Sequence, residues 1–298
     1  MEREYNHRAV LNALPAQTRK ELCAQSDGPG LLRLGLHLGA IATLGVAVWQ
    51  SSWGWPALMV IQGVLWVFLF TTLHEVTHET AFRTTWINRA TAWLTGAAVV
   101  LSPSQFRYFH LAHHRFTHDP VRDPELAGGK PETPWQYALY LSGLPDWRWR
   151  LTTLVSNALH GNQDAFVPDR AKPRIRREAL LLIALYTVIA ITAWQAALWA
   201  WLLPMLLGAP FLRAYLLAEH HLCPHVADML SNTRTTFTNR AIRWLAWNMP
   251  YHAEHHAYPA VPFHRLPDLH RIMAPHLRET SPGYSQFNAR VAKQLVSN

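Results

Sequence analysis

Histidine is frequent and clustered in this chain of 298 residues, which contains 18 of them. The densest clusters repeat spacings of three and four residues, which place side chains on one face of a helix. Neutral imidazole is a good ligand for iron, zinc and copper. The predicted ligands are His74 and His78; His110, His113 and His114; His252, His255 and His256; and either His220, our first choice, or its neighbour His221. Because one ion takes about four to six ligands, nine imidazoles predict a site for two metal ions.

Long stretches without charge indicate the elements that must position these imidazoles. No Asp, Glu, Lys or Arg occurs in residues 34–74 or 179–212. A transmembrane helix needs about 20 apolar residues, so each stretch is long enough for a hairpin of two spans. A polar and Trp-rich turn at 50–56 divides the first stretch, and Gln195 divides the second. We place the spans near 32–50, 56–74, 179–195 and 197–218.

The positive charges predict the topology of these spans. All 27 Lys and Arg lie outside the two hairpin turns. By the positive-inside rule, both termini and the long middle segment face the cytoplasm, which assigns 1–31, 75–178 and 219–298 to that side. All four histidine clusters then meet on one face of the membrane. The fold class that we predict is all-α: one domain over 1–298 with four transmembrane helices and a cytoplasmic helical cap that carries the histidines.

Composition supports a membrane protein and limits its chemistry. Hydrophobic residues make up 50% of the chain and charged residues only 15%, against about 25% in ordinary soluble domains. The net charge of +8 is concentrated partly in 170–177, next to the third predicted span, where it fits anionic lipid better than nucleic acid. Two cysteines cannot form an iron–sulfur cluster or a rubredoxin-type iron site, which need four. A cluster of that kind would therefore have to belong to a separate protein. Three shorter apolar segments, at 90–101, 135–144 and 241–247, predict helices at the membrane interface.

One motif supports a different reaction. The segment from His74 to His78 reads H-E-x-x-H, in which Glu75 would activate a zinc-bound water in a metalloprotease. Such a site needs only three protein ligands. It leaves the two H-x-x-H-H clusters without a role, so we keep it as a distant alternative.

The order of the clusters around two apolar hairpins resembles the membrane fatty acid desaturase superfamily. The resemblance covers about 55–270 and includes H-x-x-x-H, H-x-x-H-H followed by His118-Asp119-Pro120 and Asp123-Pro124-Glu125, Glu219-His220, and the late H-x-x-H-H with Pro259. It implies a non-haem di-iron site that uses O2 and two electrons to remove hydrogen from unactivated C–H bonds. The expected reaction is desaturation of a fatty acyl chain; the alternative is hydroxylation or ketolation of a lipid, carotenoid or small molecule.

The resemblance also implies partners and a location. We expect an electron donor of the ferredoxin, rubredoxin or cytochrome b5 type with its reductase, and no nucleic acid. The chain would be a multi-pass protein of a bacterial inner membrane or the endoplasmic reticulum.

Polar residues near the clusters are candidates to orient the imidazoles, because a metal-bound histidine usually donates its second N–H to a carboxylate or carbonyl. In some relatives an Asn four residues before the isolated histidine holds a metal-bound water. Leu216 occupies that position here, so Asn248 is the candidate for this role. The carboxylate candidates are Glu75, Asp119, Asp123, Glu219 and Glu254. We expect the remaining histidines, His118 and His270 among them, to be ordinary surface or core residues.

Overall fold

The computed structural model describes residues 6–50 and 54–297, and its regular structure is almost entirely helical. This confirms the helical fold class. The first half contains α1 (His7–Asn12), α2 (Ala16–Leu22), α3 (Gly28–Trp49), α4 (Trp55–Thr77), α5 (Thr85–Ala98), α6 (Pro103–Phe116), the 3₁₀-helix η1 (Pro124–Gly128), α7 (Pro134–Leu141) and α8 (Leu144–His160). The second half contains α9 (Lys172–Thr192), α10 (Trp194–Ala197), the π-helix η3 (Leu198–Leu202), α11 (Leu203–His220), α12 (Met229–Asn232), α13 (Arg240–Leu245), α14 (His252–Ala257), α15 (Leu266–Met273) and α16 (Tyr284–Ser297). Two-residue strands, β1 (Thr235–Thr236) and β2 (Thr280–Ser281), pair in parallel.

Three helices of the described chain are long and apolar enough to cross a membrane. They are α3, α4 and the continuous helix Trp194–His220, which is formed by α10, η3 and α11. At 1.5 Å per residue, the 23 residues of α4 extend about 35 Å, enough for the roughly 30 Å of a hydrocarbon core. The predicted spans 32–50, 56–74 and 197–218 coincide with these helices to within a few residues. Residues 51–53 of the first predicted turn lie outside the described residues.

The fourth predicted span, 179–195, coincides with α9 but differs from the other three. Helix α9 begins at Lys172 and carries its charges up to Glu178. Only 14 uncharged residues remain before it ends at Thr192, or about 21 Å of helix. That length is short for a complete crossing. The break in the second hairpin falls at Ala193, and Gln195 lies inside α10.

Helix α4 is the centre of the fold, because it packs on α3, α5 and α11. Gly63 and Gly208 allow α4 and α11 to approach until their backbones touch. A Cβ on Gly63 would overlap the carbonyl of Pro204, and a Cβ on Gly208 would overlap the backbone of Gly63. This close approach fixes α4 and α11 relative to each other.

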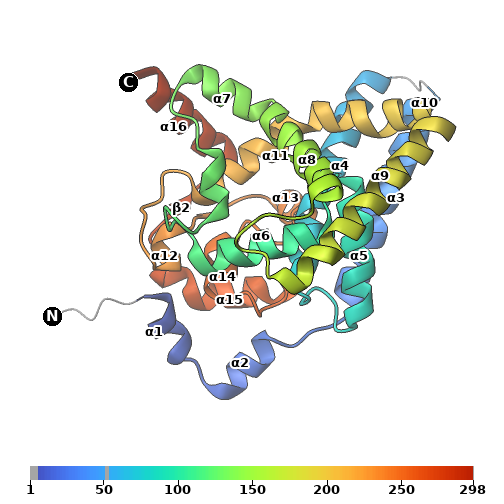
Figure 1. The fold of residues 1–298 in the computed structure, drawn as a ribbon. Helices are drawn as coiled ribbons and strands as arrows, with labels where there is room; N and C mark the ends of the chain where they lie inside the picture. Colours follow the sequence, from blue (N-terminus) through green and yellow to red (C-terminus); the bar gives the residue numbers. More distant parts are fainter. Residues whose placement is uncertain (1–5, 51–53, 298) are drawn as a thin grey trace.

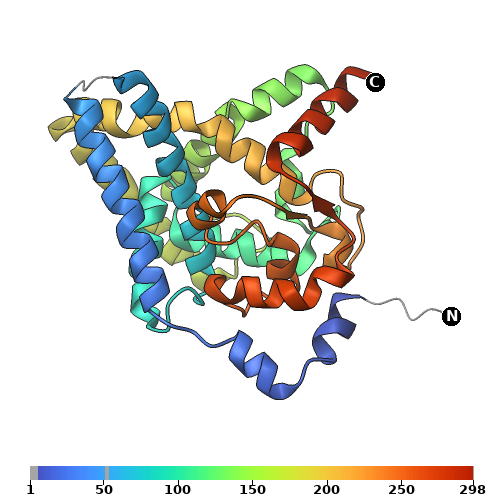
Figure 2. The same cartoon turned by 180° about the vertical axis from the view of Figure 1, so that it is seen from behind.

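The elements that surround the histidine clusters form a cap, which we define as α6, η1 and α12–α15. Figures 1 and 2 show these segments gathered at one end of α4 and α11, while the opposite ends of α3 and α9 extend away from them. Trp55 and Trp199 make an edge contact at that opposite end, with ring centroids 6.1 Å apart. Helix α14 packs on α12, α15 and β1, so the late histidine cluster is held inside the cap. The three short apolar segments form α5, α7 and α13, and are helices as predicted.

Candidate metal centre

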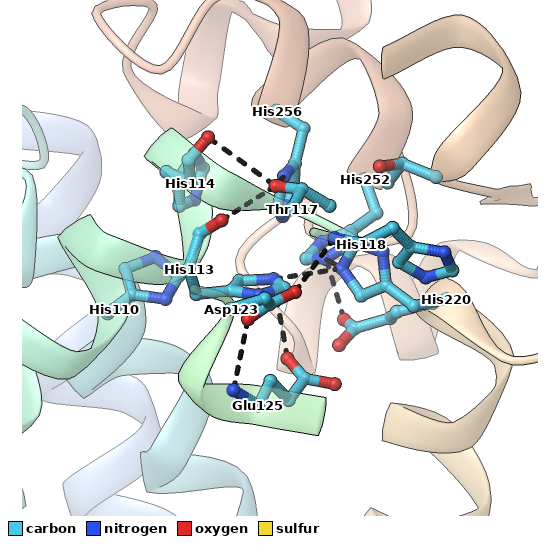
Figure 3. Close-up of polar contacts among 12 residues, drawn as sticks. His110, His113, His114, Thr117, His118, Asp123, Glu125, His220, His252 and His256 are labelled. Carbon is cyan, nitrogen blue, oxygen red and sulfur yellow. Dashed lines mark hydrogen bonds and ion pairs between the residues drawn. The ribbon is translucent and has the colours of Figure 1, made fainter. Parts of the chain in front are cut away.

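Four helices carry the nine predicted imidazoles into one region beneath α4 and α11. His74 lies in the last turn of α4, and His78 is its C-cap. His220 is the last residue of α11. Helix α6 presents His110, His113 and His114, and the short helix α14 presents His252, His255 and His256. Figure 3 shows rings from α6, α11 and α14 turned toward one another.

The imidazoles form two groups. The first group is His74, His78, His110, His114 and His255, and one nitrogen from each lies within 4.8 Å of all the others. A second set with the same spacing is His113, His220 and His256. His252 adjoins this set, because its Nε2 lies 3.1 Å from Nε2 of His220. We call these four residues the second group.

The donor atoms suit transition-metal ions. Among the residues that the structure describes, both ring nitrogens of His74, His114 and His255 are buried without a hydrogen-bond partner, as is Nε2 of His256. Leaving so many polar atoms unpaired is costly unless another partner takes them. The unpaired nitrogens face other imidazoles, which cannot all be protonated at this spacing. A bound cation would take one nitrogen from each of these rings, so the residues fit the metal ions that the sequence predicts.

Burial keeps most of these rings uncharged. It lowers the pKa of His78 and of His252 to about 3. Burial, followed by repulsion from neighbouring imidazoles, lowers the pKa well below its usual value for His110, His114, His255 and His256. Neutral imidazole keeps the lone pair that a metal requires. These rings are therefore ready to bind a metal at neutral pH without first losing a proton.

Polar neighbours orient the rings of the second group. Nδ1 of His113 lies 2.9 Å from Oδ1 of Asp123, which is buried. Nδ1 of His220 lies 3.3 Å from the carbonyl oxygen of Asn232. These contacts leave Nε2 of each ring directed at the centre of the group.

Two further contacts complete this frame. The Thr117 hydroxyl lies 3.2 Å from Nδ1 of His256, and Oε1 of Glu219 approaches Nδ1 of His252 to 3.4 Å without forming a hydrogen bond. Asp123 and Glu219 were expected from the sequence. Thr117 and Asn232 were not predicted to orient a ring.

The structure assigns other contacts to the remaining orienting candidates. Glu75 accepts a hydrogen bond from the backbone N–H of Phe263 at 2.9 Å. Consecutive helical residues point about 100° apart, so Glu75 leaves the face that carries His74. This geometry also disfavours the protease alternative, which needs Glu75 at the metal. Glu254 binds His270 and the Thr235 hydroxyl instead.

Asp119 and Asn248 are also engaged elsewhere. Asp119 forms an ion pair with Arg122 on the surface. The side-chain amide of Asn248 donates to the carbonyl of Phe263 at 2.9 Å, so it connects the segment before α14 to the segment after it. Each was selected from its position in the sequence, and each sits in a turn whose direction the sequence does not reveal.

The positions of two further histidines, His221 and His118, could not be predicted from the clusters alone. His221 follows the end of α11 in an extended conformation and belongs to neither group, whereas His220 does. His118, expected to be ordinary, is buried beside the second group, with its ring centroid 5.6 Å from that of His220 (Figure 3). Its backbone is left-handed, with φ of 64°, and its N–H donates to Oδ2 of Asp123 at 2.8 Å.

Comparison with known proteins supports this site. The family model described as "Fatty acid desaturase" matches residues 17–288. The sphingolipid delta(4)-desaturase DES1 of Drosophila melanogaster is 26% identical over 247 residues, which cover 79% of this chain and 71% of that protein. The rat sphingolipid delta(4)-desaturase/C4-monooxygenase DES2 is 23% identical, over 84% of this chain and 76% of its own length. The Candida albicans sphingolipid delta(4)-desaturase is 22% identical, over 69% and 58%. The chain therefore belongs to the fatty acid desaturase family, and it is a membrane oxidoreductase that uses O2 to desaturate a lipid.

Proposed function

We propose that the two imidazole groups bind two iron ions, one ion to each group. The observation that carries this proposal is the grouping itself: five converging imidazoles beside four more, drawn from four separate helices. Imidazole ligands suit redox-active iron, and nine are too many for one ion. His220, rather than His221, is the ninth ligand in this proposal.

Two iron ions in these groups would supply the O2 activation that removes hydrogen from an unactivated C–H bond. The protein residues position and protect that chemistry. Asp123 and Asn232 fix the direction in which the rings of His113 and His220 point. Nearly all the rings are buried, which excludes bulk water from the site. The groups lie where α4 and α11 end, so an apolar chain can reach them from the lipid.

We propose a long-chain membrane lipid with a polar head, of the sphingolipid type, as the substrate. The printed names of the relatives support this class, because all three act on sphingolipids. The position of the groups at the ends of two apolar helices also supports a lipid that keeps its head at the membrane surface. Introduction of a double bond into the chain near that head is the reaction that we assign.

The topology remains part of the proposal. We propose that α9 crosses the membrane as a fourth span by placing Lys172 and Arg174 among the lipid head groups, where long cationic side chains extend to the interface. Both termini and the cap would then face the cytoplasm, and 1–298 would act as one domain. A separate electron donor of the cytochrome b5, ferredoxin or rubredoxin type would reach the iron ions from that side.

The test is expression of the full chain in a host fed saturated long-chain sphingoid lipids, with mass spectrometry of the lipids. A product two mass units lighter supports desaturation, whereas one sixteen units heavier would assign hydroxylation instead. The purified protein is expected to hold about two iron ions per chain. A single zinc ion with no lipid product would contradict the proposal. Exposed His160, changed to Gln, is the matched control for any histidine variant.

A further inference from the structure

Glu125 is a carboxylate at the second group that none of the roles above uses. It lies in η1, and its N–H donates to Oδ1 of Asp123 at 3.0 Å. Its Oε1 lies 2.7 Å from Nζ of Lys130, so that oxygen has a partner. Its other oxygen, Oε2, points at His113 (Figure 3).

Oε2 of Glu125 contacts Nε2 of His113, the ring nitrogen that would bind a metal. Asp123 engages Nδ1 of His113, which leaves Nε2 as the free donor of that ring. Nε2 of His113 lies 3.1 Å from Nε2 of His220 and 3.3 Å from Oε2 of Glu125. The carboxylate oxygen therefore lies next to one donor atom of the second group, the Nε2 of His113.

These separations are those of ligands that share one ion. Two donor atoms that each lie about 2.1 Å from a metal, at angles of 90° to 109°, are about 3.0 to 3.4 Å apart. Both distances from His113 fall within that range, as does the 3.1 Å between Nε2 of His220 and Nε2 of His252. A surface ion pair with Lys130 would not require the second oxygen to approach a buried imidazole.

Ligand number and charge support the same assignment. The first group contains five imidazoles and the second only four. All nine rings are neutral ligands, so they leave the charge of two cations uncompensated. One carboxylate would give the second group a fifth ligand and would also supply a negative charge that the imidazoles lack. Carboxylates are common iron ligands in other protein sites.

We propose that Oε2 of Glu125 is a direct ligand of the second metal ion, which makes this centre a mixed imidazole–carboxylate site. The inference rests on the proposed function, because it needs an ion in the second group. Lys130 pairs with the other oxygen, which leaves Oε2 free to face the ion. The two ions then differ in ligand type: five imidazoles on one, and four imidazoles with one carboxylate on the other.

The test counts and distinguishes the ions in the full chain, purified in lipid nanodiscs and loaded anaerobically with ⁵⁷Fe. Iron per chain is measured by elemental analysis, and the two sites are resolved by Mössbauer spectroscopy. The wild type is expected to hold about two irons with unequal spectra. Glu125→Ala is expected to weaken binding of the second iron at least about tenfold, leaving the spectrum of the first unchanged. Glu125→Gln keeps the shape of the side chain but removes its charge. It should change the spectrum of the second iron even if Glu125→Ala fails to fold.

Controls separate a ligand from an ion pair. Glu132 is exposed in the same loop, and Glu132→Ala should keep both irons. Lys130→Met removes the cation but retains the carboxylate, and should also keep both. Two irons with unchanged spectra in both Glu125 variants would overturn the proposal. So would loss of the second iron in Lys130→Met but not in Glu125→Gln. A wild type that holds no iron would instead show that the proposed function itself fails.

Discussion

The two imidazole groups are built in different ways. In the first group the rings pack mainly on one another, as with His74 and His110, whose centroids are 4.1 Å apart. The carboxylates adjacent in sequence, Glu75 and Glu254, turn away to other partners. In the second group, polar neighbours hold the ring nitrogens that face outward. The arrangement of the rings in the first group therefore depends on helix packing, and that in the second group depends on hydrogen bonds.

The largest effect is expected from removing a ring of the first group. His74→Ala removes a proposed ligand on α4, whose two ring nitrogens have no hydrogen-bond partner in the described chain. We expect lipid product to fall by more than about 100-fold, because even residues that only orient a ligand are worth about 10 to 100-fold. Mass spectrometry of lipids measures the product, and elemental analysis measures iron. His160→Gln should retain both, and a His74→Ala protein with unchanged turnover would contradict the ligand assignment.

An intermediate effect is expected from Asp123. Asp123→Asn keeps the size of the side chain but loses the charge that orients His113, and should weaken metal binding at the second group by about 10 to 100-fold. Asp119→Asn is the matched control, because Asp119 pairs with Arg122 on the surface. Iron titration of both proteins tests the comparison. Equal affinity in the two variants would show that the hydrogen bond to His113 does not support the metal site.

The relative position of the two groups is expected to respond to the contact between α4 and α11. Gly208→Ala places a methyl group against the backbone of Gly63, which should destabilise the fold by about 1 to 3 kcal/mol. Gly35→Ala is the control, since a Cβ there meets nothing within 4 Å and alanine favours the helix. Thermal unfolding in detergent measures both. A Gly208→Ala protein as stable as the Gly35→Ala protein would mean that the helices can separate without cost.

Sequence reasoning reached the clusters of imidazoles because helical periodicity fixes which side chains share a face. His110, His113 and His114 needed only a helix at that point, and α6 is one. The helices α3, α4 and α11 were visible because apolar length alone identifies them. The polar residues around the imidazoles could not be identified in this way. Glu125, in η1, and His118 lie between α6 and α7, where the chain turns through a left-handed residue, His118, that no sequence pattern predicts.

The same reasoning explains the difference between α9 and the other long helices. Its apolar portion was recognised as a span, and the residues before it were assigned to the cytoplasmic side without a prediction of where the helix begins. The helix begins at Lys172 and includes the charges through Glu178. Ser102 and Ser104 donate hydrogen bonds to the carboxylate of Glu178 at 2.7 Å, which draws this part of α9 against α6. No local pattern in the sequence announces a contact over more than 70 residues.

The smallest effect that distinguishes the groups concerns pH and His118. Burial, followed by repulsion from His225 and Lys130, lowers the pKa of His118 to about 4. The unfolded chain binds a proton at His118 near pH 6.5, whereas the folded chain does not until about pH 4. The contribution of this residue to stability is therefore complete above pH 6.5 and is lost as the pH falls toward 4. From pH 7.5 to 5.5 the loss is about 1 kcal/mol.

His118→Asn isolates this contribution, because asparagine tolerates the left-handed backbone at this position and carries no titrating group. Thermal unfolding of the wild type and the variant at pH 7.5 and 5.5 gives the difference. The variant should lose less stability than the wild type on acidification, and the gap should close above pH 6.5. The exposed His160→Gln should follow the wild type at both values. A His118→Asn protein with the same pH dependence as the wild type would show that His118 is not held neutral, and that the surroundings of the second group are more polar than the burial of this ring implies.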